Sequence, residues 1–199
     1  MVKIDLAKED KNYYTAKTSP QVSTFPKLLY LTIEGRGEPK DKSFTEAVQA
    51  LYSLDYGIKS LCKKAEKDFT VAKLEGLWWV KSNKPALEVP RAEWYWKLLI
   101  RLPDFVTSDI VDKAKRDVME KKGIGLVKEI KCEKIIEGKC IQVLHIGPYS
   151  TEPETIKEMK KMMKENNLTE NGHHHEIYLS DPRKTLPQKM KTILRQPVK

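Results

Sequence analysis

Cysteine is scarce in this sequence, and its placement excludes two classes of small protein. The 199 residues include three cysteines, Cys62, Cys132 and Cys140, and none of them forms a C-x-x-C pair. An odd number of dispersed thiols is not the pattern of a disulfide framework, and without such pairs a zinc ribbon is excluded. Unpaired thiols are typical of a reducing compartment, so the sequence predicts a cytoplasmic protein.

Long hydrophobic runs are also missing. No stretch approaches the roughly 18 consecutive apolar residues of a membrane-spanning helix. The charged residues between Met1 and Asp10 stand where a signal peptide would be apolar. We therefore expect neither secretion nor a membrane partner.

Arginine is scarce beside lysine, although basic residues outnumber acidic ones. The formal net charge is +9, an excess that can attract nucleic acid or an acidic partner. However, the lysines are spread along the chain, and arginine is the residue preferred for phosphate and base recognition. We therefore expect a solvated, lysine-rich surface and no direct binding of nucleic acid.

Phosphate-binding and serine-nucleophile motifs are absent as well. The sequence contains no G-x-x-x-x-G-K-[ST], no G-x-G-x-x-G and no G-x-S-x-G. We therefore expect neither nucleotide-driven chemistry nor a serine hydrolase, and no cofactor is predicted.

The hydrophobic pattern of the first half predicts one strand, one helix and two more strands. Apolar, β-prone runs indicate the strands, and apolar residues three and four apart indicate the helix. In chain order these elements are expected at 25–33, 43–60, 69–81 and 92–102. The polar residues 1–22 before them are expected to form a mobile or loosely docked arm.

The second half repeats this kind of order after a connecting helix predicted at 108–121. Two strands joined by a turn at Glu137-Gly138 come first. They are followed by an amphipathic helix and a strand ending before Asp181-Pro182. Thr185 and Gln188 are spaced to cap a last short helix that ends near Leu194.

The two halves also share a short local pattern. Residues 28–35 and 140–147 each form an apolar strand that ends in glycine and precedes an amphipathic helix. After that helix, each half has a glutamate followed at once by an apolar strand with aromatic residues. The comparison sets Glu75 of the first half opposite Glu176 of the second. The shared pattern is short, so by itself it does not establish a repeat.

All four tryptophans lie in two adjacent predicted strands, with Trp78 and Trp79 in one and Trp94 and Trp96 in the other. Side chains alternate along a strand, so Trp94 and Trp96 share a face, while Trp78 and Trp79 point to opposite faces. A face with several indole rings suits stacking on an aromatic ring or a cation. Ordinary core filling is the alternative, although a buried indole N–H needs a partner.

Glu75 and Glu176 each lie within an apolar strand. Such a carboxylate lies either on a solvated face or in a cleft, and the residues alone leave both readings open. In a cleft, a carboxylate attracts a cationic ligand or acts as a general base on water. His174 is expected on the strand face of Glu176 and Tyr178, as a hydrogen-bond neighbour of the pocket.

A metal site is the less favoured interpretation of the histidines. His173 and His175 share one strand face, and with His145 from a neighbouring strand they could bring three imidazoles together. No cysteine or carboxylate supplies a recognised ligand spacing, so no metal is predicted.

With these residues in hand, the sequence resembles the GyrI-like family over about residues 20–198. HIGPYS at 145–150 is similar to the family's strand-end motif H-x-G-P-Y/F. Residues 174–198 are similar to its E-x-Y-L-x-D-P motif and closing segment. LEGLWWV at 74–80 and LPDFV at 102–106 resemble the stand-alone members with two repeats.

The resemblance implies an α+β fold of the SHS2 type, as in regulatory effector-binding domains. Two pseudo-symmetric βαββ-type repeats with antiparallel sheets would form a central ligand cleft. Accordingly, 23–199 is expected to be one domain that follows the arm at 1–22. Repeat one would span about 23–106 and repeat two about 125–199, in a monomer or homodimer.

The resemblance also implies a function. In related regulator domains, the glutamate of the E-x-Y motif meets lipophilic cations, and here that residue is Glu176. Some stand-alone members are similar to cyclopropanoid cyclopropyl hydrolases, which open the activated cyclopropane of DNA-alkylating natural products with water. On that hypothesis, Glu176 with Glu75 orients or deprotonates the water, and Tyr149 or Tyr178 polarises the conjugated carbonyl.

The expected partner is therefore a hydrophobic aromatic or cationic small molecule, and the expected role is xenobiotic detoxification. The predicted ligand-binding residues are Trp79, Trp94, Trp96, Tyr178, His145 and His174. No helix-turn-helix segment precedes the matched region, so we expect a stand-alone binder or an enzyme. The alternative is a non-enzymatic module, either a protein-interaction domain of the gyrase-inhibitor type or a drug-sensing effector domain.

Overall fold

The computed structural model describes residues 3–199, which divide into two compact units. Unit 1 comprises the described residues up to Glu9 together with Leu28–Ala72 and Trp78–Ile135. Unit 2 comprises Asp10–Lys27, Lys73–Leu77 and Ile136–Lys199.

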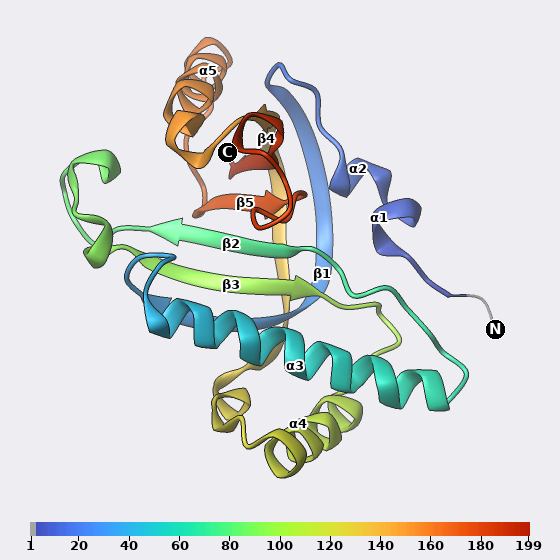
Figure 1. The fold of residues 1–199 in the computed structure, drawn as a ribbon. Helices are drawn as coiled ribbons and strands as arrows, with labels where there is room; N and C mark the ends of the chain where they lie inside the picture. Colours follow the sequence, from blue (N-terminus) through green and yellow to red (C-terminus); the bar gives the residue numbers. More distant parts are fainter. Residues whose placement is uncertain (1–2) are drawn as a thin grey trace. The chain divides into compact units, whose positions relative to one another are not determined.

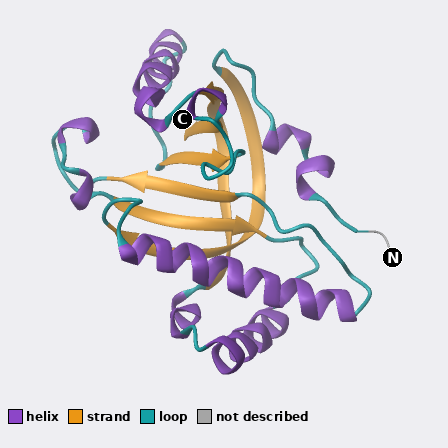
Figure 2. Ribbon diagram, in the orientation of Figure 1, coloured by secondary structure: helices purple, strands orange, loops and turns teal. Residues whose placement is uncertain are grey.

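Two short helices come first, and the order βαββ then occurs twice, with α4 between the two repeats (Figure 1; Figure 2). The strands are β1 (Gln21–Arg36), β2 (Leu74–Trp79), β3 (Tyr95–Arg101), β4 (Lys131–Ile146), β5 (His174–Tyr178) and β6 (Lys191–Pro197). The helices are α1 (Leu6–Glu9), α2 (Lys11–Tyr14), α3 (Lys42–Lys64), α4 (Ser108–Lys122) and α5 (Glu152–Glu165). In each repeat the third strand lies between the first and the second, as β1-β3-β2 and β4-β6-β5. The predicted α+β fold with paired βαββ repeats is confirmed.

Unit 1 is organised around the long helix α3, which packs against β3 and α4 (Figure 1). β1 and β3 are antiparallel, with Tyr30 opposite Arg101. Buried residues recur along α3 at helical spacing, so one stripe that includes Leu51, Leu54 and Ile58 faces the core. Each such side chain contributes roughly 1.5–3 kcal/mol when fully buried, which explains why so long a helix is held in place.

Unit 2 is organised around β6, which is antiparallel to both of its neighbours, β4 and β5. Leu194 of β6 lies opposite Val143 of β4 and Glu176 of β5. Met159 and Met163 of α5 join Val143 and Leu194 in one buried cluster, so α5 covers this face of the strands.

Two expectations for the second half are wrong. The sequence predicts a turn at Glu137-Gly138, but β4 continues through both residues. Gly138 has a φ of +66°, the conformation of the glycine in a β-bulge, which bends a strand without ending it. The helix predicted to end near Leu194 is instead a 3-10 turn, Pro187–Lys189, followed by β6. Ladder hydrogen bonds on both sides of β6 outweigh the local capping signal.

The N-terminal segment also differs from the loosely docked arm that the sequence predicts. Tyr13 and Tyr14 are buried within it. The backbone N–H of Leu144 donates to the carbonyl oxygen of Lys17 at 2.7 Å. Because the two tyrosines stand among polar residues, no hydrophobic period reveals their burial.

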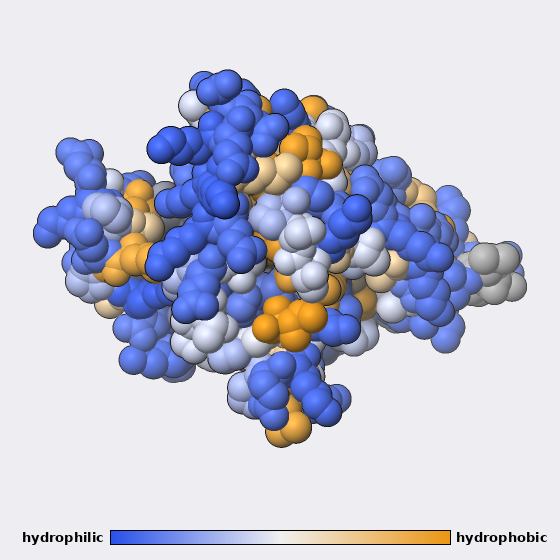
Figure 3. Space-filling model, turned by 90° about the horizontal axis from the view of Figure 1, so that it is seen from above, coloured by the Kyte–Doolittle hydropathy of each residue, from blue (hydrophilic) through white to orange (hydrophobic). Residues whose placement is uncertain are grey.

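No helix among the described residues is long and apolar enough to cross a membrane. The face drawn in Figure 3 is mostly hydrophilic, with hydrophobic residues in separate patches. This face fits the predicted solvated surface.

Candidate functional site

Glu176 lies in β5 with two polar neighbours on the same strand face. Tyr178 Oη donates a hydrogen bond to Glu176 Oε2 at 2.9 Å, and His174 Nε2 lies 3.7 Å from Glu176 Oε1. The predicted shared face of these three residues is confirmed, because side chains two apart in a strand point the same way. The Glu176 side chain is 14% exposed, so it is sheltered but still reached by solvent.

Tyr149 extends this cluster from the turn that precedes α5. Its ring meets the ring of Tyr178 edge-on, with centroids 6.0 Å apart. Burial raises the pKa of Tyr149 to about 12, and the negative charges of Glu152, Glu176 and Asp181 add to the shift. The phenol therefore keeps its proton at neutral pH and can donate a hydrogen bond. We call Glu176, Tyr178, His174 and Tyr149 the Glu176 cluster.

His145 is buried beside the turn that carries Tyr149. Its Nδ1 lies 2.9 Å from Thr155 Oγ1, and its Nε2 lies 3.2 Å from both the carbonyl oxygen of Pro148 and Thr151 Oγ1. These contacts tie the end of β4 to the first turn of α5. His145 is thus a support of the turn, and direct contact with a ligand stays a prediction.

Glu75 does not share the strand face of Glu176. Its Oε2 accepts a hydrogen bond from Tyr13 Oη at 2.5 Å and lies 2.9 Å from His175 Nε2. His175 and Glu176 are consecutive in β5, so their side chains point to opposite faces. The two glutamates that the repeated pattern sets opposite each other therefore lie on opposite sides of β5.

Two tryptophans of unit 1 pack against Phe44 of α3, and a third packs against one of them. The Trp78 ring stacks on Phe44 and meets Trp94, and Trp96 meets Phe44 edge-on at 5.3 Å. Trp94 Nε1 donates to the carbonyl oxygen of Val89 at 3.0 Å. Within residues 3–199, Trp96 Nε1 has no hydrogen-bond partner although its ring is buried. The contacts are those of a core, but the unpaired N–H of Trp96 is unusual there.

Trp79 belongs to a different group of side chains. Its ring is half-buried and stacks on Tyr95, with centroids 5.8 Å apart, and Lys81 Nζ lies 4.4 Å from the centre of the Tyr95 ring. The predicted opposite directions of Trp78 and Trp79 are confirmed. The ligand-binding roles of the tryptophans stay predictions.

The sequence reasoning missed a buried group of charges on the other face of β5. His175 lies between two carboxylates, with Nε2 2.9 Å from Glu75 and Nδ1 2.8 Å from Glu137. Arg195 Nη1 donates to Glu137 Oε2 at 2.8 Å, and its Nη2 donates to Gln142 Oε1 at 3.1 Å. We call these five residues the buried array. Among these residues, only Glu75 was marked as unusual by the sequence, because it is an acidic residue inside an apolar strand.

The buried array holds two opposite pKa shifts. Burial favours neutral His175, but the charges and hydrogen bonds of Glu137 and Glu75 outweigh it and raise the pKa of His175 to about 9. Burial likewise favours a protonated Glu137, but His175 and Arg195 outweigh it and lower the pKa of Glu137 to about 2. At neutral pH the array therefore contains an imidazolium, a guanidinium and a Glu137 carboxylate.

A surface hollow of about 150 Å³ in unit 1 contains none of the predicted site residues. Its lining residues are Thr32, Ile33, Glu34, Glu129 and Lys131. The hollow is smaller than the roughly 300–1,000 Å³ of typical ligand sites. No group of three His, Cys, Asp or Glu residues in the described part of the chain could hold a metal ion.

Two solved structures from Listeria innocua are similar to this chain along its whole length. One, an uncharacterised conserved protein, is 39% identical with a TM-score of 0.93, covering 99% of this chain and 100% of that one. The other, named as a hydrolase, is 39% identical with a TM-score of 0.88 and the same coverage.

A more distant likeness is limited to the fold. The C-terminal domain of EcmrR is 13% identical with a TM-score of 0.58, covering 91% of this chain and 97% of that domain, which shows a shared fold alone. No curated protein matches the chain. The model of the GyrI-like small molecule binding domain matches residues 18–199, and the chain therefore belongs to this family.

Proposed function

We propose that the chain binds a bulky aromatic or cationic small molecule at the Glu176 cluster and hydrolyses an activated cyclopropane ring in it. The observation that carries the proposal is the hydrogen bond from Tyr178 to Glu176, with the Tyr149 ring against Tyr178. The cluster thus combines a carboxylate with two phenols. Membership of a small-molecule-binding family supports the binding, and the hydrolase name of a 39% identical relative supports the chemistry.

The local charge supports a cationic or electron-poor ligand. The negative charges of Glu152, Glu176 and Asp181 all act on Tyr149, although the whole protein has a net charge of +9. A carboxylate beside aromatic rings attracts a cation through both its charge and the ring faces. The ring faces also offer stacking to a flat aromatic ligand.

The proposed reaction adds one water molecule across a strained bond. Glu176 accepts a proton from water as the water oxygen bonds to a cyclopropane carbon. The ring C–C bond breaks, and its electron pair passes through the conjugated system to the carbonyl oxygen. That oxygen takes a proton from Tyr149, whose pKa of about 12 keeps the proton available at neutral pH. The proton held by Glu176 then returns to Tyr149 through solvent, so the cycle closes.

The tryptophans enter the proposal as ligand-binding residues of unit 1. Trp96 is the first to test, because its buried indole N–H has no hydrogen-bond partner in the described chain. Trp79 and Trp94 follow. We give Glu75 no part in activating the water, because it bonds to His175 on the other face of β5.

The test is to incubate the protein with a cyclopropanoid alkylator and quantify the ring-opened hydrate by mass spectrometry. We expect Glu176→Gln to lower the hydration rate by roughly 10²–10⁴-fold, the usual contribution of a general base. Glu165→Gln, an exposed site on α5, is the matched control and should keep the wild-type rate. Hydration that is unchanged in Glu176→Gln would contradict the mechanism.

Binding is tested separately by the fluorescence anisotropy of a planar cationic dye. Glu176→Gln should weaken dye binding, and Glu165→Gln should not. If the wild-type protein binds such a dye but forms no hydrate, the chain is a drug-binding domain without chemistry. If it neither binds the dye nor forms hydrate, the Glu176 cluster is not a ligand site.

A further inference from the structure

We propose that Tyr13 occupies a second ligand site of unit 2, one that recognises a phenol ring, and that residues 10–17 act as its intramolecular ligand. The site is bounded by the buried array, on the His175 face of β5. It is therefore distinct from the Glu176 cluster, which lies on the opposite face.

The Tyr13 side chain is held as a bound phenol would be. Its hydroxyl donates to Glu75 Oε2 at 2.5 Å, and the guanidinium carbon of Arg195 lies 4.3 Å from its ring centre. The rings of Phe25 and Tyr14 meet it edge-on at 5.5 Å and 4.8 Å. The residue is fully buried. An acceptor for the hydroxyl, a cation over the ring face and aromatic edges around it make a specific site for a phenol.

The side chains around this site are positioned mainly by one another and by the backbone of the Tyr13 segment. Arg195 Nη2 donates to the carbonyl oxygen of Tyr13 at 2.9 Å, a contact that Tyr13→Ala leaves in place. Arg195 is fixed by Glu137 at 2.8 Å and by Gln142 at 3.1 Å. His175 bridges Glu75 and Glu137 at 2.9 Å and 2.8 Å. Four of these five residues come from the paired strands β4, β5 and β6. The site should therefore keep its geometry when the Tyr13 ring is absent.

The chemistry of the walls is unusual for a core. Desolvating several charges opposes folding, and apolar residues of similar volume are often more stabilising. Glu75 is fully buried, yet its Oε1 has no hydrogen-bond partner among the described residues. An unused buried acceptor beside the Tyr13 hydroxyl indicates a site built for polar recognition, since ordinary cores pair nearly all such atoms.

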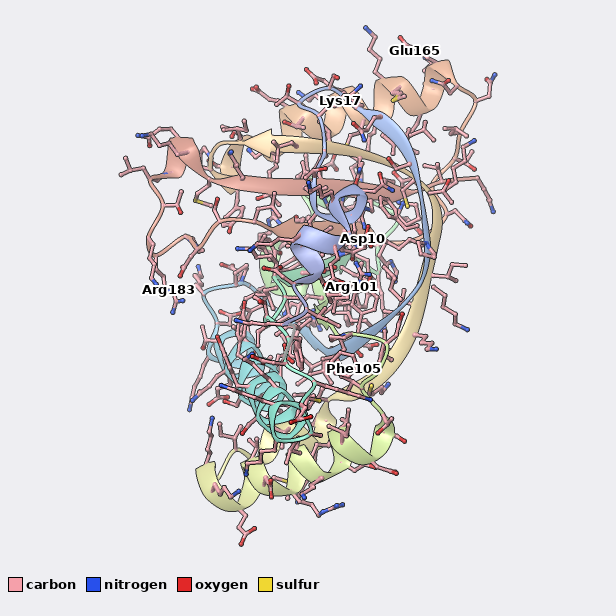
Figure 4. All side chains as sticks on the ribbon, turned by 90° about the vertical axis from the view of Figure 1, so that its right-hand side faces the viewer. Asp10, Lys17, Arg101, Phe105, Glu165 and Arg183 are labelled. Carbon is pink, nitrogen blue, oxygen red and sulfur yellow. The ribbon has the colours of Figure 1, made fainter. Side chains whose placement is uncertain are left out.

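The segment that carries Tyr13 is suited to displacement. α2 is four residues long, and so short a helix has little stability of its own. Asp10 and Lys17, labelled in Figure 4, mark the ends of the segment. Between them, only Tyr13 and Tyr14 are buried. Three hydrogen bonds also hold the backbone of the segment: Arg195 donates to the carbonyl oxygen of Tyr13 at 2.9 Å, Gln142 to that of Thr15 at 3.3 Å, and Leu144 to that of Lys17 at 2.7 Å. A competing phenol must therefore replace the Tyr13 ring without the help of these contacts.

The experiment uses p-cresol, which reproduces the tyrosine side chain, and toluene, which lacks the hydroxyl. In full-length Tyr13→Ala, p-cresol should raise the melting temperature by several degrees, and toluene should raise it less because it cannot donate to Glu75. Equal effects of the two compounds would overturn the proposal, since the vacated space would then be only an apolar cavity.

A second measurement needs no variant. In the wild-type protein, saturating p-cresol should speed amide hydrogen exchange of residues 11–17 by about tenfold or more as it competes with Tyr13. Unchanged exchange would show Tyr13 to be an ordinary core residue. The same response is expected in Glu176→Gln, and its loss there would assign p-cresol to the Glu176 cluster and overturn the proposal.

Discussion

The two units bury carboxyl groups in opposite ways. Unit 1 buries Asp55 in α3, and neither carboxyl oxygen has a hydrogen-bond partner among the described residues. Burial raises the pKa of Asp55 to about 7, against the attraction of Lys59. Unit 2 buries Glu137, but the charges of His175 and Arg195 overcome the effect of burial and lower its pKa to about 2.

The protonation state of a buried carboxyl group is therefore set by its neighbouring charges and hydrogen-bond donors, and not by its degree of burial. Desolvation alone favours the neutral form in both units. Where cations and hydrogen-bond donors surround the carboxylate, the charged form wins, as at Glu137. Two repeats with the same strand order can therefore contain buried acids that titrate in different pH ranges. Asp55 changes its charge near neutral pH, whereas Glu137 keeps its charge there.

The largest expected effect comes from removing the charge of Glu137. In Glu137→Gln, Arg195 keeps its buried positive charge without its anion, and His175 loses the larger of the two influences that raise its pKa. Breaking a buried ion pair in this way costs about 3–5 kcal/mol. The measurement is the free energy of unfolding in urea at pH 7.

Glu165→Gln is the control for this loss. The Glu165 carboxylate lies 3.9 Å from Lys161 and its side chain is 60% exposed. Exposed pairs contribute about 0–1 kcal/mol, so the control should unfold almost as the wild type does. A loss as small in Glu137→Gln would mean that the array is solvated and that the contrast between the units is wrong.

Three of the four residues of the Glu176 cluster could be placed together from the sequence because their geometry is local, whereas Tyr149 comes from another element and was named only through the family resemblance. His174, Glu176 and Tyr178 alternate along one strand, and the period of two is enough to place them on one face. The helices α3 and α4 follow from apolar spacing for the same reason. The periodicity of side chains within one strand or helix is thus enough to place residues that share that element.

The buried array was out of reach because each member resembles something else when read locally. Glu137 precedes a glycine, His175 ends a run of three histidines, and Arg195 follows a helix-capping pattern. They meet only because β4 and β5 both pair with β6, a contact between distant segments. No periodicity or motif encodes that pairing, so the charges could not be assigned to one another from the sequence.

The second effect concerns Asp55 and depends on pH. Its pKa is about 7 in the folded protein, against an ordinary value of 3.8, so the folded state holds the proton more tightly than the unfolded state. The resulting stabilisation is complete below pH 3.8 and is lost as the pH rises to 7. About three pKa units correspond to roughly 4 kcal/mol.

Asp55→Asn removes this titration. The variant should gain up to a few kcal/mol of unfolding free energy relative to the wild type between pH 4 and pH 8. Urea unfolding at both pH values measures the gain. Asp68→Asn is the comparison, since Asp68 bonds to Lys59 and its pKa is lowered, so it should not reproduce the gain. A pH-independent difference between Asp55→Asn and wild type would mean that Asp55 is hydrated.

The smallest effect concerns Gly35 and Gly147, the glycines that end the similar segments 28–35 and 140–147 of the two halves. A Cβ at Gly35 would lie 2.2 Å from the Trp96 ring, so that glycine permits close packing. Gly147 has a φ of +145°, so that glycine permits a backbone conformation. Gly35→Ala and Gly147→Ala should each cost about 1–3 kcal/mol, one by overpacking and one by strain.

Double-mutant cycles separate these two causes although the single losses are alike. Trp96→Leu removes the ring that the new Cβ of Gly35→Ala would overlap. The unfolding free energies of this pair should therefore show a coupling of about 0.5–3 kcal/mol. Thr151→Ala removes the side-chain oxygen 3.0 Å from a Cβ at Gly147, but it leaves the backbone conformation unchanged, so coupling there should be near zero. Strong coupling at Gly147 and none at Gly35 would reverse the assignment. In that case the close packing would lie at Gly147 and not at Gly35. When a glycine is required only by its φ, truncating a neighbouring side chain does not lower the cost of replacing it.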